Sequence, residues 1–165
     1  MPGGANVNHW ITNFQLFYFV LEDLVFLNYV PDNREGLSSH YDENIWLASS
    51  GGGIGGYWGD VRSDGIPTSN GSKSTGSIPF MKVVDSQMLA FNQGVTRRGS
   101  YAAYMDISHP EIEEFMVMRK ESGGDVNRKC LNLHNGVNIN NAFLKAVETD
   151  DDWRLIDPKT KEAVK

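Results

Sequence analysis

The sequence predicts an α/β fold, and three observations support this class. Two amphipathic stretches with helical spacing, 32–49 and 79–91, alternate with short apolar stretches typical of strands, at 101–107 and 131–139. Glycines and turn-forming pairs separate these stretches. The 165 residues are enough for one domain with a substantial core.

Composition restricts the partners and the compartment. The 15 Lys and Arg against 21 Asp and Glu give a net charge of -6, which argues against a nucleic-acid backbone or an anionic membrane as the main partner. The single cysteine, Cys130, excludes an internal disulfide and favours the cytoplasm. The apolar stretch 10–30 contains Glu22 and Asp23 and lacks the basic flank of a signal peptide, so we expect a buried strand or helix there.

The first helix is expected to begin at a capping box, Asp32-x-x-Glu35, in which the Asp32 side chain accepts a hydrogen bond from the backbone at Glu35. Apolar residues then recur at spacings of four, four and three until a Ser-Ser-Gly sequence ends the helix. These residues form the predicted core-facing stripe: Leu37, Tyr41, Ile45 and Ala48.

The glycine-rich stretch 51–56 predicts close backbone packing or positive φ angles. Three of its glycines fit the G-x-G-x-x-G pattern of dinucleotide sites, but a helix precedes them and no helix follows, so we reject that interpretation. The stretch 71–75 resembles the end of a P-loop, yet Ser72 separates the glycine from Lys73, and we reject it as well.

The middle of the chain predicts extended pieces and loop over 57–75, with turns at 64–65 and 70–71. Pro79 suits the first turn of the second helix, whose apolar stripe continues to Phe91. A loop with two adjacent arginines, 94–100, then leads into the strand 101–107.

The last third is expected to contain a second capping box, Ser108 to Glu111, followed by a helix that turns Ile112, Phe115 and Met116 to the core. Strands at 131–134 and 137–139, a short helix capped by Asn140 and a hairpin over 153–164 complete the expected elements.

Residues with catalytic or metal-binding chemistry form no recognisable constellation. The four histidines lack metal-site spacing, and Cys130 has no neighbouring base, so no metal site and no catalytic residue is expected: His9, His40, His109 and His134 are interpreted as isolated. Cationic side chains in loops could hold phosphates or could be ordinary solvated charges; from the residues alone both readings stay open for Arg62, Lys73, Arg97 and Arg98.

Several long segments, in the same order, resemble the large catalytic subunit of class I ribonucleotide reductases, over about 32–157. They are GGGIGGYWGDVRSDG (51–65), STGSIPFMKVVD (74–85), NQGVTRRGSYAAYMDISHPEIEEFMVMRK (92–120), NLHNGVNINNAFLKAV (132–147) and DWRLIDP (152–158). The resemblance implies that 32–165 is part of a ten-stranded α/β barrel containing the effector-specificity region, and that 1–31 is an atypical apolar N-terminal segment.

The same resemblance implies a site for an allosteric effector, a deoxynucleoside triphosphate or ATP. Asp32, Asn33 and Arg34 would contact its base or sugar, and Arg62 with the 63–75 loop would hold its phosphates. Ser69 stands where some members have a further phosphate-binding arginine, which Lys73 is expected to replace.

The loop 93–100 resembles the family's communicating loop between effector and substrate. Gln93 would relay the effector's identity, Arg97 or Arg98 would contact the substrate nucleotide, and Gly94 and Gly99 would supply backbone freedom. The helices 32–49 and 79–92 would form a homodimer interface with a second large subunit.

The sequence also departs from the family. It lacks the redox cysteine expected shortly before Asp32 and the Asn-x-Cys-x-Glu motif of the thiyl radical. The parent enzyme reduces ribonucleoside diphosphates with a radical from a small subunit and a thioredoxin- or glutaredoxin-type reductant. We therefore expect this fragment to be inactive alone. The alternatives are a piece of a split reductase, active on assembly with the remaining large-subunit segments, or a non-catalytic nucleotide-binding or interaction module.

Overall fold

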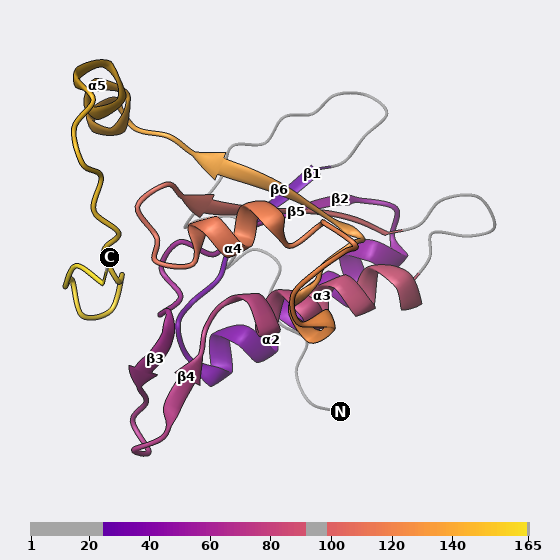
Figure 1. The fold of residues 1–165 in the computed structure, drawn as a ribbon. Helices are drawn as coiled ribbons and strands as arrows, with labels where there is room; N and C mark the ends of the chain where they lie inside the picture. Colours follow the sequence, from indigo (N-terminus) through magenta and orange to yellow (C-terminus); the bar gives the residue numbers. More distant parts are fainter. Residues whose placement is uncertain (1–24, 92–98, 165) are drawn as a thin grey trace.

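The computed structural model describes residues 25–91 and 99–164, and its centre is a four-stranded parallel sheet (Figure 1). The strand order is β1-β2-β5-β6, with every neighbouring pair parallel. The strands are β1 (Val25–Tyr29), β2 (Gly53–Tyr57), β5 (Ser100–Asp106) and β6 (Leu133–Asn138). The α/β class predicted from the sequence is confirmed.

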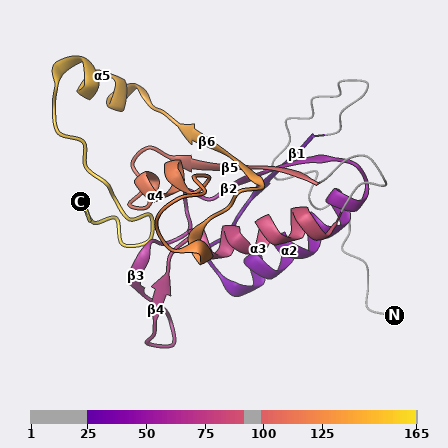
Figure 2. The ribbon, with the colours of Figure 1, turned by 45° about the vertical axis from the view of Figure 1, so that its right-hand side comes forward.

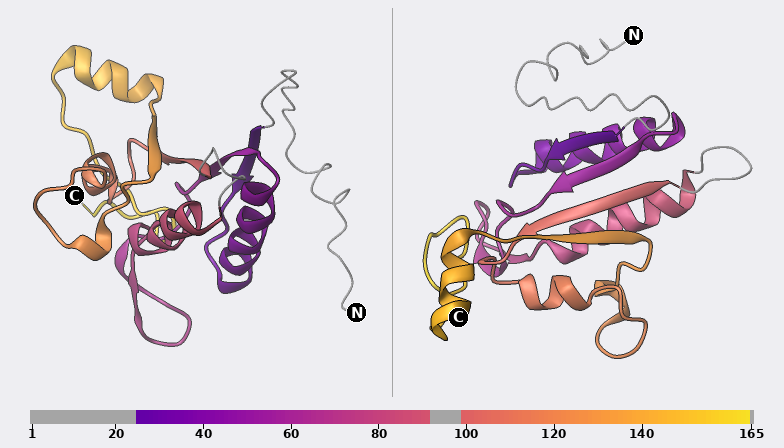
Figure 3. Two further views of the ribbon diagram at one scale, coloured as in Figure 1. Left: turned by 90° about the vertical axis from the view of Figure 1, so that its right-hand side faces the viewer. Right: turned by 90° about the horizontal axis from the view of Figure 1, so that it is seen from above.

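Helices cover one face of this sheet (Figure 3). α2 (Arg34–Ser49) and α3 (Ile78–Ala90) pack beside each other under the strands, and the shorter α4 (Ile112–Val117) contacts β5 and β6. Side chains point alternately to the two faces of a strand, so every second residue of β5 is buried against the helices. The residues between them, including Tyr104, lie on the opposite face.

A polar network lies in the centre of the core between α2 and the sheet. The Tyr101 hydroxyl lies 2.8 Å from His40 Nε2 and accepts a hydrogen bond from Trp58 Nε1 at 3.0 Å. All three side chains are buried, and Gly56 leaves the space that the Tyr101 hydroxyl fills. The prediction that the glycine-rich stretch packs closely against its neighbours is therefore confirmed.

The start and the buried face of α2 differ from the predictions. Asn33 is the N-cap, and its side chain accepts the Gly36 backbone N–H at 2.7 Å, so the Asp32 capping box was wrong. The most buried positions of α2 are His40, Asn44 and Ala48, while the predicted stripe residues Leu37, Tyr41 and Ile45 are only half-buried. His40 takes a central position because the Tyr101 hydroxyl offers it a buried partner, whereas the buried amide of Asn44 has no hydrogen-bond partner among the described residues.

The second capping box was also wrong. Glu111 is the residue before α4, and no side chain caps that helix. The Glu111 carboxylate instead accepts hydrogen bonds from Ser77 N and Oγ at 2.7 and 2.8 Å, where α3 begins. Ile112 and Phe115 are buried as predicted, but Met116 is 47% exposed because the short helix turns it outward.

Several other predicted elements are confirmed. α3 has Pro79 in its first turn, and Asn140 caps α5 (Asn141–Thr149) by accepting Phe143 N at 2.8 Å. The two expected strands around 131–139 form one strand, β6, and the C-terminal hairpin is reduced to a single antiparallel bridge between Ile156 and Ala163. A 3-10 turn, η1 (Val126–Arg128), precedes β6.

The polar stretch after β2 forms a hairpin of β3 (Asp64–Pro67) and β4 (Lys73–Thr75), which projects away from the sheet (Figure 2). The turn expected at 70–71 is confirmed, but the one expected at 64–65 was wrong, because both residues lie in β3, where the pairing with β4 shifts register. Gly65 and Gly71 have φ angles of 81° and 80°, a region that glycine enters without steric cost. The hairpin starts beside Arg62, at the carboxyl end of β2.

Candidate functional site at the carboxyl end of the sheet

Asp32 and Arg62 meet where β1 and β2 end. Arg62 Nε donates to both carboxylate oxygens of Asp32, at 2.8 and 3.0 Å. Each side chain is 17% exposed. The residue expected to contact an effector's base or sugar and the arginine expected to hold its phosphates, far apart in sequence, are therefore adjacent in the fold.

The same guanidinium joins this pair to the β3–β4 hairpin. Arg62 Nη1 donates to the carbonyl oxygen of Pro67 at 3.0 Å, and Nη2 lies 3.4 Å from the carbonyl oxygen of Asp32. Pro67 is the last residue of β3 and pairs with Lys73 on β4. The arginine thus connects the end of β1 with the strands that carry the hairpin turn.

Ser69 and Lys73 are exposed on the hairpin. The turn between them is held by Thr68, whose N–H donates to the Ser72 carbonyl at 2.8 Å and whose hydroxyl lies 2.7 Å from Ser72 Oγ. Asn70 Oδ1 accepts from the Ser72 hydroxyl at 2.8 Å. The structure therefore brings Ser69 and Lys73 onto one element with Arg62 at its base.

Asn33 and Arg34, the other two residues expected at the effector, begin α2 and are exposed. The Asn33 amide oxygen is already engaged with Gly36 N, so its first role is to cap the helix. Arg34 is the first residue of α2, two positions after Asp32.

Asp157 anchors the loop that carries Arg62. Its Oδ2 accepts hydrogen bonds from Ser63 N and Ser63 Oγ at 2.8 and 2.7 Å, and its Oδ1 accepts from the N–H groups of Lys159 and Thr160, both at 2.9 Å. Burial acts to raise the pKa of Asp157, but these hydrogen bonds outweigh it and lower the pKa below its usual value. Sequence reasoning missed this anchor, because 94 positions separate Ser63 from Asp157.

The communicating-loop residues Gln93, Gly94, Arg97 and Arg98 lie outside the described residues. Gly99 is described and leads into β5; a Cβ atom there would lie 3.0 Å from Met88 Sδ. It therefore stands at the amino end of the sheet, whereas Asp32 and Arg62 stand at the carboxyl end. Seven strand residues at about 3.3 Å each place these ends about 20 Å apart.

Within residues 25–91 and 99–164, no helix packs on the face of the sheet away from α2, α3 and α4, and we call this the open face. Tyr29, Tyr57 and Tyr104 occupy the same register on three adjacent strands, and the first two rings have centroids 6.3 Å apart. The Tyr57 hydroxyl donates to Asp106 Oδ2 at 2.6 Å, and burial together with this hydrogen bond raises the pKa of Tyr57. No sequence prediction singled out this row of tyrosines. The signal available in the sequence was a tyrosine at the end of β1, at the end of β2 and near the end of β5.

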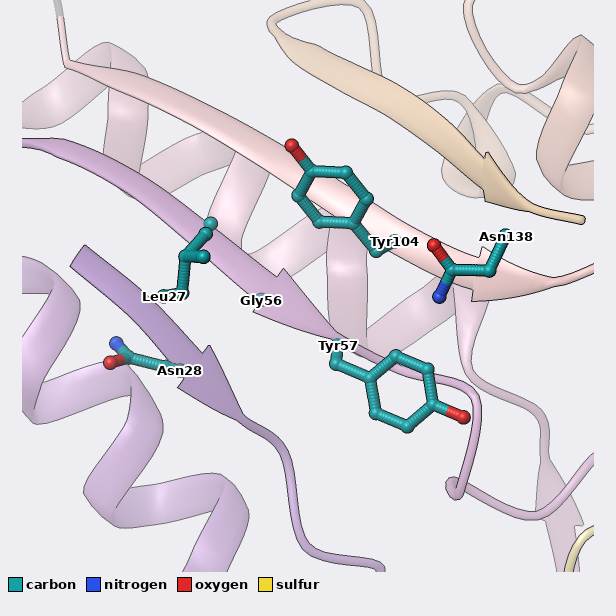
Figure 4. Close-up of a pocket in the computed structure, with 7 residues that line it drawn as sticks. Leu27, Asn28, Gly56, Tyr57, Tyr104 and Asn138 are labelled. Atoms are coloured by element: carbon teal, nitrogen blue, oxygen red, sulfur yellow. The ribbon is translucent and has the colours of Figure 1, made fainter. Parts of the chain in front are cut away.

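A pocket of about 340 Å³ opens on this face (Figure 4). Tyr104 and Leu27 border it from neighbouring parts of the sheet, and Asn138 lies at its far side, donating to Asp106 Oδ1 at 3.1 Å. Gly55 and Gly56 of β2 also line it.

The histidines of the part of the chain that the structure describes do not form a metal site. Three or more His, Cys, Asp or Glu side chains do not gather into a metal-binding group among these residues. Burial lowers the pKa of His40 to about 4, and His109 Nε2 bonds the Val61 carbonyl at 2.8 Å, so both are structural histidines. His134 is exposed, and His9 lies outside the described residues.

Cys130 is buried, and burial raises the pKa of its thiol to about 12. A thiol with such a pKa forms little thiolate near neutral pH, which agrees with the interpretation of an inert side chain. Within residues 25–91 and 99–164, no helix has the length and apolar character needed to cross a membrane.

Comparison with known proteins places this chain among reductases. The family model "Ribonucleotide reductase, barrel domain" matches residues 25–165. A Frog virus 3 protein named as a ribonucleoside-diphosphate reductase large subunit is 53% identical over 135 residues, which are 82% of this chain and 23% of that protein. The large subunit of Invertebrate iridescent virus 6 is 40% identical over 83% of this chain and 14% of its own length. The alpha subunit of Helicobacter pylori is 37% identical over 81% of this chain and 17% of its own length.

The fold thus defines an α/β protein built on a parallel sheet with loops at its carboxyl end. The chain belongs to the ribonucleotide reductase family and corresponds to part of its α/β barrel domain. It spans about a quarter or less of the length of the curated relatives named here.

Proposed function

We propose that this chain forms the effector-specificity region of a ribonucleoside-diphosphate reductase large subunit and binds a deoxynucleoside triphosphate or ATP at the carboxyl end of the sheet. The observation that carries the proposal is the position of Arg62, which contacts Asp32 and the base of the exposed hairpin at once. Membership of the reductase family gives this cluster its expected ligand.

The chemistry of the cluster suits such a ligand. A guanidinium group binds phosphate oxygens through charge-assisted hydrogen bonds, and Lys73 adds a second cation on the hairpin. The Asp32 carboxylate can accept a hydrogen bond from a sugar hydroxyl or a base amino group. Arg62 and Lys73 would hold the phosphates, and Asp32 with Arg34 would contact the nucleoside.

The effector would be shared between two copies of the chain. Within one copy, Gly99 and the cluster at Arg62 lie at opposite ends of the sheet, too far apart for one nucleotide to contact both directly. A homodimer through α2 and α3, with the two copies antiparallel, would bring the communicating loop of one copy to the cluster of the other. This arrangement allows the effector to bias the loop that reads the substrate.

Replacing Arg62 with alanine is expected to weaken binding of a deoxynucleoside triphosphate by about tenfold or more, because a charged hydrogen-bonding group to phosphate is lost. Isothermal titration of the full chain with each deoxynucleoside triphosphate and with ATP measures the change. Arg119→Ala is the matched control, since Arg119 is exposed at the end of α4 and carries the same charge. Equal affinities for wild type and Arg62→Ala would contradict the site.

The dimer proposal makes a separate prediction for Trp46. This side chain is 69% exposed on α2, and Val83 and Leu89 on α3 are 43% and 45% exposed. Large aromatic side chains dominate binding energy at interfaces, so Trp46→Ser should raise the dimer dissociation constant by about tenfold or more. Analytical ultracentrifugation over a concentration series measures it. Val126→Ser, which removes another exposed apolar side chain on η1, should leave the constant unchanged.

The open sheet face favours one alternative, a piece of a split reductase that functions after assembly. Parallel sheets are normally covered on both faces, yet Leu27 and Tyr29 are 61% and 48% exposed on the face without helices. Further large-subunit segments would cover them. Mixing the chain with the remaining large-subunit segments, the small subunit and a dithiol reductant would then yield deoxynucleotides, whereas nucleotide binding without product would indicate a binding module.

The chain alone is proposed to reduce no ribonucleotide. Reduction of this kind needs a cysteine that becomes a radical and a cysteine pair that is oxidised, and the sequence has only Cys130, which is buried. Deoxynucleotide formation by the purified chain would overturn this part of the proposal.

A further inference from the structure

Arg62 and Asp32, two side chains of the proposed effector site, already bind each other in the structure. Arg62 Nε donates only to the Asp32 carboxylate, at 2.8 and 3.0 Å, and the two terminal nitrogens reach the Pro67 and Asp32 carbonyl oxygens. The carboxylate thus holds the arginine in the way that a bound anion would. Both side chains are largely shielded from water, at 17% exposure each, so their attraction is screened less than that of a surface pair.

We propose that Asp32 is an internal competitor for the phosphate-binding arginine, and that only a ligand with both phosphates and a hydroxyl donor replaces both halves of the pair. This inference rests on the proposed effector site. A phosphate that takes Arg62 leaves Asp32 without its partner and close to a second negative charge. A nucleotide that also offers its sugar hydroxyl to Asp32 removes this cost, because a half-buried carboxylate regains a hydrogen bond.

The pair would therefore act as a filter against phosphate compounds without a sugar. Inorganic polyphosphates can satisfy the guanidinium but provide no hydroxyl for the carboxylate. Separation of Asp32 from Arg62 also releases the segment after β1, immediately before the Asn33 cap of α2. Ligand binding would therefore alter the start of the helix proposed for the dimer interface. Asp32 would then be a residue that sets ligand specificity by competition, in addition to its contact with the nucleoside.

The test compares two probes, inorganic tripolyphosphate and the deoxynucleoside triphosphate that binds the full-length chain most tightly, by isothermal titration. The variants are Asp32→Asn, Arg62→Ala and the double variant Asp32→Asn/Arg62→Ala. Asp152→Asn is the matched control, because Asp152 is an exposed carboxylate outside α2 and α3 and its change removes the same charge. Circular dichroism and thermal unfolding of each variant record whether it is folded.

Asp32→Asn is expected to bind tripolyphosphate about fivefold more tightly than wild type, the size that one weakly screened ion pair supports. The advantage of the nucleotide over tripolyphosphate should fall by at least the same factor. Neither effect should occur in Asp152→Asn, and the tighter tripolyphosphate binding should disappear when Arg62 is also replaced.

Unchanged or weaker tripolyphosphate binding by Asp32→Asn would overturn the inference and would make Asp32 a residue that orients Arg62. An increase that persists in the double variant would overturn it as well, since the competition would then not involve Arg62. If either of these results occurs while Arg62→Ala still weakens nucleotide binding, the effector site stands and only the competition fails. Equal nucleotide affinity of wild type and Arg62→Ala, or no nucleotide binding by wild type, would refute the effector site and the inference together.

Discussion

Gly56→Ala is expected to lower the free energy of unfolding by about 3 kcal/mol, because the added methyl group overpacks the core. A Cβ atom at this position would lie 1.7 Å from the Tyr101 hydroxyl oxygen and 2.8 Å from Tyr101 Cζ. Tyr101 cannot move aside cheaply, because it is fully buried and its hydroxyl bonds both His40 and Trp58. Chemical denaturation followed by circular dichroism measures the change.

The neighbouring glycine provides the control. In Gly55→Ala the new Cβ would meet Leu27 Cδ2 at 2.6 Å, but this is the end of an exposed side chain on the open face, which can rotate away. Tyr101→Phe removes the hydroxyl, so Gly56→Ala should cost less in that background. Equal losses for Gly55→Ala and Gly56→Ala would show that the two faces of β2 are packed alike and would contradict the architecture.

Asp157→Asn is expected to lower the free energy of unfolding at neutral pH by about 2 kcal/mol, because an amide nitrogen cannot accept the hydrogen bonds that one carboxylate oxygen receives. Asp157 is fully buried and ties the Arg62 loop to the C-terminal bridge. The affected donors, at Ser63 or at Lys159 and Thr160, would lose their partner.

The lowered pKa of Asp157 also predicts how the free energy of unfolding changes with pH. Because the folded state lowers the pKa of Asp157 below 3.8, its ionised form contributes stability above the unfolded pKa, and that contribution is lost as pH falls through the lower folded pKa. Wild type should therefore lose more stability on acidification than Asp157→Asn. The control Asp152→Asn, at an exposed position, should follow the wild-type curve. Parallel curves for wild type and Asp157→Asn would rule out the anchoring role.

Periodicity predicted the long elements well and their ends poorly. α3 and β5 follow the expected ranges because apolar spacing reflects burial directly. The start of α2 was misplaced because Asp32 and Asn33 are both good capping residues, and only the distant Arg62 decides which one caps. The Ser108 box failed for a similar reason, since Glu111 finds a partner in Ser77 on another element. Local patterns do not contain such long-range partners.

The candidate site was predictable in its members and unpredictable in its contacts. Resemblance to the family named Asp32 and Arg62, but nothing local indicates that the two side chains bond each other. The tyrosines of the open face were missed because each occupies an ordinary strand position, and only the register aligns them across three strands. Tertiary structure adds what the sequence pattern lacks: which residues share an end or a face of the sheet.

Hydrogen–deuterium exchange of the chain, with and without a saturating deoxynucleoside triphosphate, tests the proposed effector site most directly. The account predicts slower exchange over 32–36 and 62–75, at the Asp32–Arg62 pair and its hairpin, and over the communicating loop 93–100 when the chain is dimeric. Exchange that is unchanged everywhere, or slowed only in the glycine-rich stretch 51–56, would contradict an effector site at the carboxyl end of the sheet.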